Sequence, residues 1–65
     1  MDYTYYIAYD DGNIIIRDHE NVPIQRYDKI RKEWVTDWNM SGIYSGDVPA
    51  KVISKEEAER MISED

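Results

Sequence analysis

The clearest alternation of apolar and polar positions lies near the start of the chain. Two runs rich in tyrosine and isoleucine, YTYYIAYD and NIIIRD, flank the dipeptide Asp11-Gly12. Asp-Gly is favoured in two-residue hairpin turns, so residues 3–18 are predicted to form a β-hairpin in which Ile7 lies opposite Ile16. The more apolar face of this hairpin is predicted to meet the core, and it carries Tyr5, Ile7, Tyr9, Ile14 and Ile16. The other face carries Tyr6, Ala8, Ile15 and Arg17.

A second hairpin is predicted over residues 24–38, which hold both tryptophans of the chain. A four-residue loop from Lys29 to Lys32 would place Tyr27 opposite Trp34. Tyr27, Trp34 and Trp38 then share one face of the hairpin. Ile24 and Val35 share the other face. Because both faces are apolar, the pattern leaves open which of them is buried.

The chain between Asp37 and Gly46 is predicted to form one or two irregular helical turns. Met40, Ile43 and Tyr44 stand at helical spacing, but Gly42 in the middle weakens a helix by about 1 kcal/mol relative to alanine. Pro49 then interrupts the chain, and residues 50–53 are predicted to add a short strand at an edge of the sheet, where a neighbouring proline is tolerated.

A capping sequence predicts where the last helix begins. In Ser54-Lys55-Glu56-Glu57, the serine hydroxyl can accept from the Glu57 amide and the glutamate can reach back. A helix of about 55–64 follows, with Ala58, Met61 and Ile62 as an apolar stripe that docks on one face of the sheet. The predicted fold class is therefore α+β, with an antiparallel sheet of two hairpins, a possible edge strand and one C-terminal helix.

The order of these segments resembles small bacterial proteins of unknown function. The resemblance rests on a Tyr-Asp…Trp-Val hairpin, then Ser-Gly-Ile-Tyr-Ser-Gly-Asp, then Ile-Ser-Lys-Glu-Glu-Ala-Glu, and covers roughly residues 25–61. These motifs describe a turn and a helix cap. The resemblance therefore implies a fold, and it carries over neither an activity nor any site residue.

Size and composition indicate one small domain over residues 1–65. A chain this short buries only about 60% of its unfolded surface, so stability is expected to be marginal and self-association favourable. The absence of cysteine agrees with a reducing compartment. No signal peptide or long apolar run is present, so we expect a cytoplasmic protein without membrane contact. The net charge of −6 disfavours direct binding to nucleic acid.

The sequence offers little catalytic chemistry. His19, the single imidazole, is flanked by Asp18 and Glu20, and it is interpreted as a solvated turn residue in preference to a general base or metal ligand. The stretch Asp10-Asp11-Gly12-Asn13 lacks the spacing of a calcium loop and is interpreted as a turn. No nucleophile motif or phosphate loop is present. We therefore predict no enzyme activity, cofactor, metal or small-molecule substrate.

Two surface functions remain. The first is a protein-interaction module or homodimer that uses exposed aromatic and apolar side chains, which are typical interface anchors. The candidate surface comprises Tyr6, Ile15, Trp34, Trp38 and Tyr44. In the alternative interpretation, these side chains are covered within a small core.

The second possible function is an acidic mimic of a nucleic-acid backbone that blocks a basic protein. Most of the acids belong to two groups, one near the first hairpin and one in the C-terminal helix. They are Asp10, Asp11, Asp18, Glu20, Glu56, Glu57, Glu59, Glu64 and Asp65. Solvated charge that keeps the protein soluble is the alternative interpretation. A basic cluster at the tip of the second hairpin, Arg26, Lys29, Arg31 and Lys32, could at most bind nucleic acid weakly against the acidic background.

Overall fold

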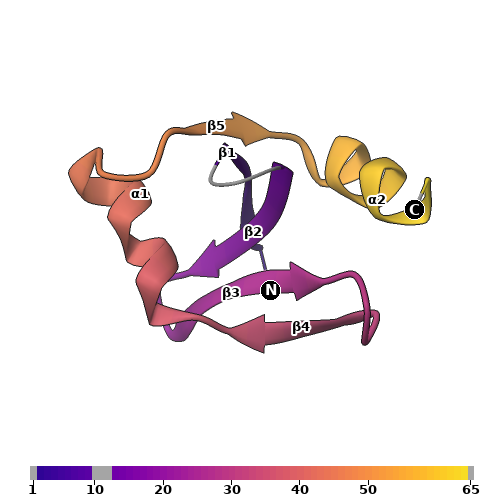
Figure 1. The fold of residues 1–65 in the computed structure, drawn as a ribbon, viewed down its shortest axis with the longest axis horizontal. Coiled ribbons are helices and arrows are strands. Elements are labelled where there is room, and N and C mark those ends of the chain that lie inside the picture. The colour runs from indigo at the N-terminus through magenta and orange to yellow at the C-terminus, as the bar shows by residue number, and fades with distance from the viewer. Residues whose placement is uncertain (1, 10–12, 65) are drawn as a thin grey trace.

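A computed structural model describes residues 2–9 and 13–64 of the chain. Within them, four strands come first along the chain, followed by two short helices, a fifth strand and a last helix (Figure 1). The strands are β1 (Thr4–Tyr9), β2 (Asn13–His19), β3 (Val22–Asp28), β4 (Glu33–Thr36) and β5 (Ala50–Ile53). The helices are the 3₁₀ turn η1 (Trp38–Ser41), the short α1 (Gly42–Ser45) and α2 (Lys55–Ser63).

The five strands form a single antiparallel sheet in the order β4-β3-β2-β1-β5. The predicted α+β class is confirmed, but the two hairpins are not separate units, because β2 also pairs with β3 and the first four strands make a continuous meander. The predicted edge strand 50–53 is present, and it pairs with β1 at the far end of the sheet from β4. One strand from late in the chain thus completes the sheet beside its first strand.

The register predicted for the first hairpin is wrong by one residue. Ile7 lies opposite Ile15 and Tyr9 opposite Asn13, which leaves three residues between the strands where the prediction assumed two. The predicted Asp11-Gly12 turn itself lies outside the described residues. A slip of one residue moves every side chain of a strand to the other face. Ile15 therefore faces the same side as Tyr5 and Ile7, and Ile16 faces the opposite side.

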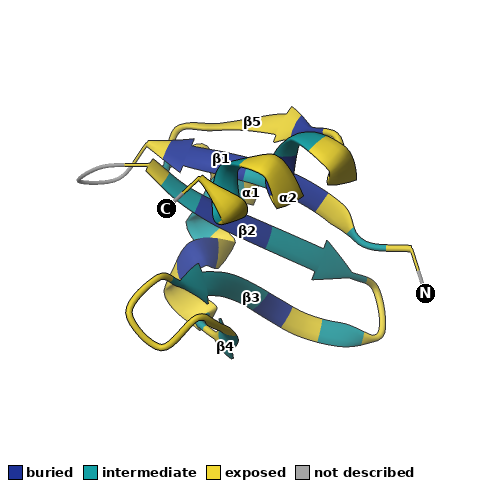
Figure 2. Cartoon of the chain, turned by 90° about the vertical axis from the view of Figure 1, so that its right-hand side faces the viewer, coloured by how far each residue is buried: buried dark blue, intermediate teal, exposed yellow. Residues whose placement is uncertain are grey.

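Both faces of the sheet are covered, which is why three consecutive isoleucines fit in β2. On one face, α2 lies over the sheet (Figure 2). Its residues Ala58, Met61 and Ile62 pack against the buried residues of that face. The buried residues on that side are Tyr5, Ile7, Ile15, Ile53 and Ala58. On the other face, η1 and α1 cover the sheet with Met40 and Ile43. The buried residues there are Ala8, Ile16, Ile24 and Met40.

The second hairpin has the predicted pairing, with Tyr27 opposite Trp34. These two rings face α2, whereas Ile24 is buried on the other side of the sheet. Trp38 does not share their face as predicted. The strand β4 ends at Thr36, and the Asp37 carboxylate accepts from the Asn39 amide at 3.0 Å, which begins η1 at Trp38. The side-chain cap therefore turns the chain away before Trp38 can align with Trp34.

The predicted capping sequence begins α2. The Ser54 hydroxyl accepts from the Glu57 amide at 3.0 Å, and Glu56 and Glu57 lie in the first turn, where the helix dipole favours negative charge. The irregular turns predicted between 37 and 46 are resolved as η1 followed by α1. Gly46 ends α1 in the left-handed conformation with φ of 87°, which glycine adopts without steric cost.

Candidate functional site

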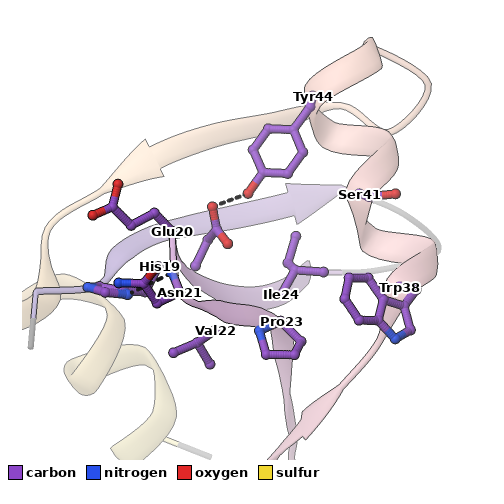
Figure 3. Close-up of a pocket in the computed structure, with 10 residues that line it drawn as sticks. His19, Glu20, Asn21, Val22, Pro23, Ile24, Trp38, Ser41 and Tyr44 are labelled. Carbon is purple, nitrogen blue, oxygen red and sulfur yellow. Dashed lines mark hydrogen bonds between the residues drawn. The ribbon is translucent and has the colours of Figure 1, made fainter.

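An open groove of about 500 Å³ lies beside the turn between β2 and β3, on the sheet face covered by η1 and α1 (Figure 3). One wall is formed by residues 18–24, and the other by side chains of η1 and α1. Its lining residues are Asp18, His19, Glu20, Asn21, Val22, Pro23, Ile24, Trp38, Ser41 and Tyr44. We call this feature the Trp38 groove.

Trp38 is the largest exposed apolar side chain of the groove, with 66% of its surface accessible. Its position follows from Asp37, which caps η1 and also accepts from Arg26 Nε at 2.9 Å. Met40, two residues further along the turn, faces the sheet and is buried. Anchored in this way, the short helix directs Met40 inward and leaves the Trp38 ring over the opening, where Pro23 also lies (Figure 3).

Tyr44 contributes the second exposed ring of the groove, 56% accessible. Its hydroxyl donates a hydrogen bond to the Asp18 carboxylate across the opening (Figure 3). The ring also packs edge-on against Tyr6, with centroids 6.5 Å apart and planes at 88°. Partial burial and the bond to Asp18 raise the pKa of Tyr44, so the hydroxyl stays protonated as a donor well above neutral pH. Burial and the Asp18 charge raise the pKa of Tyr6 in the same way.

The polar side chains of the groove give it an acidic character. Asp18 and Glu20 carry carboxylates, and the lining includes neither lysine nor arginine. His19 is held in the turn, because its Nδ1 accepts from the Asn21 amide at 3.2 Å and its ring lies 6.0 Å from that of Tyr3. Among the described residues, no three acidic or imidazole groups gather as metal ligands would. The arrangement therefore offers recognition by apolar area and negative charge.

The structure does not bring the five predicted surface residues together. Trp38 and Tyr44 line the same groove, and Tyr6 lies half-buried against Tyr44. Ile15, placed on the outer face by the wrong register, is only 2% exposed beneath α2. Trp34 lies half-buried on that same α2 side.

The Trp34 ring is stacked against the Arg17 side chain within the protein. The Arg17 guanidinium carbon lies 4.5 Å from the Trp34 ring centroid and 4.3 Å from that of Tyr3, and Arg17 Nε donates to Gln25 Oε1 at 2.7 Å. This cation–π arrangement links β2 to the edge strand β4 and to the segment before β1. Trp34 thus serves packing on the α2 side and is unavailable to the groove.

Sequence reasoning missed the polar wall of the groove. Asp18 and Glu20 are predicted only as members of the acidic groups, and the fold brings them, together with Pro23, opposite Trp38 and Tyr44. A usable signal was present in Asp37, since an aspartate three residues before a methionine can cap a helical turn that buries the methionine and leaves the intervening tryptophan outside.

The charged clusters are divided by the fold. Asp18 and Glu20 border the groove, while Glu56, Glu57 and Glu59 belong to α2 on the opposite face of the sheet. These described acids do not form one continuous row.

In the basic hairpin, Arg26 pairs with Asp37, and Arg31 lies 3.9 Å from Glu33. The Asp28 carboxylate accepts from the Arg31 and Ile30 amides in the turn, and the bond from the Arg31 amide chiefly lowers the pKa of Asp28. Neighbouring acids thus offset the positive charge of this hairpin.

Fold and groove together define a small α+β protein whose antiparallel sheet is covered on both faces and carries the aromatic, acidic Trp38 groove. Comparison of the chain with protein-family models, curated proteins and solved structures gave no match. The resemblance of residues 25–61 to small bacterial proteins therefore stays a prediction. Among the described residues, none of the helices has the length and apolar character needed to cross a membrane.

Proposed function

We propose that this protein is a non-enzymatic protein-interaction module and that the Trp38 groove is its binding site. The observation that carries the proposal is the Trp38 ring, 66% exposed in an open groove beside the exposed ring of Tyr44. Tryptophan and tyrosine are the residues most often found at the energetic centre of protein interfaces. Here the Asp37 side chain caps the turn that carries Trp38, and the hydrogen bond to Asp18 holds Tyr44 of α1, so both rings are in place before a partner arrives.

The exposed area is large enough to matter for affinity. A tryptophan can bury roughly 200 Å², so about 130 Å² of Trp38 remains for a partner to cover. At about 25 cal/mol per Å², complete burial of that area supplies roughly 3 kcal/mol before the cost of ordering the partner. Burial of the exposed part of the Tyr44 ring adds a smaller contribution to the binding free energy. One ring pair thus supports a transient interaction, which neighbouring contacts would strengthen.

The charge of the groove selects the chemistry of the partner. Asp18 and Glu20 border an opening without lysine or arginine, and the whole chain carries a net charge of −6. A segment with apolar side chains and at least one lysine or arginine is complementary to this surface, and it would be steered toward it at low salt. A second copy of the chain is less complementary, because two acidic surfaces would meet. We place this interaction in the cytoplasm, in keeping with the absence of cysteine.

The test compares the Trp38→Ala variant with Ile30→Ala. Ile30 is 94% exposed at the tip of the β3–β4 hairpin and does not line the groove, so its truncation is a matched loss of exposed apolar surface. Each protein is immobilised, and partners captured from lysate are identified and then titrated directly by calorimetry. We expect the Ile30→Ala variant to bind like the wild type and Trp38→Ala to weaken binding at least tenfold, as for an interface hot spot.

Two results would contradict the proposal. Equal affinity of the wild type and Trp38→Ala would show that partners bind elsewhere on the protein. A partner without basic residues, bound with an affinity independent of salt, would remove the charge argument. Sedimentation equilibrium separates self-association from partner binding, since a dimer through the groove would dissociate to monomers in the Trp38→Ala variant.

A further inference from the structure

Strand β5 forms one edge of the sheet and pairs on one side only, with β1. Ala50, Lys51 and Val52 are all exposed, and Val52 keeps 63% of its surface accessible although its opposite residue in β1 is the half-buried Tyr6. In Figure 1 this strand runs along the outer side of the molecule between α1 and α2. No described element of the chain pairs with the outer side of β5.

The hydrogen bonding of β1 and β5 shows which backbone groups of β5 point outward. The Tyr9 amide donates to the Pro49 carbonyl at 2.9 Å, which makes that opposite pair a hydrogen-bonded one. Hydrogen-bonded and non-hydrogen-bonded pairs alternate along an antiparallel ladder. The next pair, Ala8 with Ala50, is therefore non-hydrogen-bonded, and so is Tyr6 with Val52. The N–H and C=O groups of Ala50 and Val52 consequently face away from β1.

The side chains of β5 define what an added strand would meet. Val52 lies on the same face as Tyr6, and Lys51 lies on the α2 face with Ile7. In an antiparallel strand bonded to Ala50 and Val52, one residue would stand directly opposite Lys51 in a non-hydrogen-bonded pair, where side chains approach most closely. An acidic residue there is favourable, and a basic one is unfavourable.

We propose that the β5 edge accepts an extended segment of a partner protein as a sixth, antiparallel strand, with an acidic side chain opposite Lys51. Main-chain bonds to Ala50 and Val52 would supply the docking, and Lys51 would supply the selectivity. A second copy of this chain fits poorly. Pairing β5 with β5 so that Ala50 and Val52 both bond sets Lys51 against its own counterpart, which places two like charges at closest approach. This edge is separate from the Trp38 groove, so neither proposal depends on the other.

The test uses the ¹⁵N-labelled full chain and two extended peptides. One is acetyl-Thr-Val-Glu-Val-Thr-amide, and the other carries lysine in place of the glutamate. We expect the first peptide to shift the amide resonances of Ala50 and Val52 and to slow their hydrogen exchange, with an affinity roughly fivefold above that of the lysine peptide. The Lys51→Glu variant should reverse this preference. Trp34 and Thr36 in the opposite edge strand β4 serve as internal reference amides.

A matched pair of variants isolates the backbone contact. Val52→Pro removes an outward N–H that the β1 ladder does not use, a change that edge strands tolerate, while Val52→Thr keeps the N–H and a branched side chain. We expect Val52→Thr to bind the glutamate peptide and Val52→Pro to lose that binding, with the Tyr9 amide resonance unchanged in both. If a Val52→Pro chain does not fold, the Lys51→Glu reversal still decides the question.

Three outcomes would overturn the proposal. The first is the absence of shifts at Ala50 and Val52 with millimolar glutamate peptide, and the second is shifts confined to β4. The third is a dimer in sedimentation equilibrium that Val52→Pro dissociates, because it would make a second copy the occupant of the edge. Loss of partner binding in Trp38→Ala with unchanged peptide shifts at β5 would leave this proposal intact and separate it from the groove.

Discussion

The burial of Ile15 beneath α2 can be tested by substitution. In the structure this side chain is 2% exposed, packed among Tyr5, Ile7 and Ile53 beneath Ala58 of α2. In the register predicted from an Asp-Gly two-residue turn, Ile15 would lie on the opposite face of the hairpin with Tyr6 and Arg17. Substitutions at Ile15 therefore distinguish a side chain buried beneath α2 from one exposed on the predicted interaction surface.

The expected cost follows from burial. Ile15→Val deletes one buried methyl group, which destabilises a protein by about 1 kcal/mol. Ile15→Thr keeps the shape of valine but buries a hydroxyl, which adds roughly 1–3 kcal/mol unless the hydroxyl finds a partner. Against a total of about 3–10 kcal/mol for a domain of this size, the threonine variant should be close to unfolding. Ile30→Val and Ile30→Thr, at a side chain 94% exposed, should leave stability unchanged.

Urea unfolding followed by tryptophan fluorescence and by far-ultraviolet circular dichroism measures these differences. With an m value of about 1 kcal/mol per M, Ile15→Val should lower the midpoint by roughly 1 M, and Ile15→Thr should lower it by two to three times as much. The reasoning would be refuted if Ile15→Thr unfolded within about 0.5 kcal/mol of the wild type, because a side chain that tolerates a hydroxyl at no cost is not buried under α2.

Two further predictions follow from single contacts. Ser54→Ala removes the hydroxyl that accepts from the Glu57 amide and should destabilise the protein by about 1 kcal/mol in urea unfolding. The control Ser63→Ala, at the other end of α2, should destabilise the protein much less. Equal effects of the two substitutions would show that the cap is unimportant. The raised pKa of Tyr44 means that the fold favours the protonated hydroxyl, so its contribution to stability is fully present below pH 10 and is lost as the pH rises above 10 toward the folded-state pKa. Thermal unfolding between pH 8 and 11 should therefore show a smaller alkaline loss for Tyr44→Phe than for the wild type, and parallel curves would argue against the bond to Asp18.

Local signals in the sequence predicted most of the elements. The Tyr27–Trp34 pairing, the edge strand 50–53 and the cap at Ser54 each depend on residues close together in the chain, and the structure has all three. The first register was missed because three consecutive isoleucines in β2 make either register apolar. The deciding factor is that both faces of the sheet are covered, and α2 and η1 supply that cover from distant parts of the chain.

The candidate site was predicted only in part, for a related reason. Trp38 and Tyr44 were expected at a surface, and they line the groove together. Ile15 was assigned to that surface through the register error, and Trp34 is occupied by the Arg17 stack, which joins residues distant in sequence. The acidic wall at Asp18 and Glu20 arises because β2 and β3 place their turn opposite η1. No short-range pattern encodes that juxtaposition.

The pairing of β5 with β1 has a consequence for the order in which the molecule assembles. The meander from β1 to β4 needs only connections between strands that follow one another in sequence. The core on the α2 face is complete only after Ile53 of β5 has paired with Tyr5. Closing the loop between Tyr5 and Ile53 costs roughly 3 kcal/mol of chain entropy, and this cost is offset only when β5 and α2 dock together. We therefore expect the meander to form early and the β5–α2 segment to be added after the rate-limiting step. In that sequence of events, the Ser54 cap governs how long the folded state lasts and has little influence on how quickly it forms.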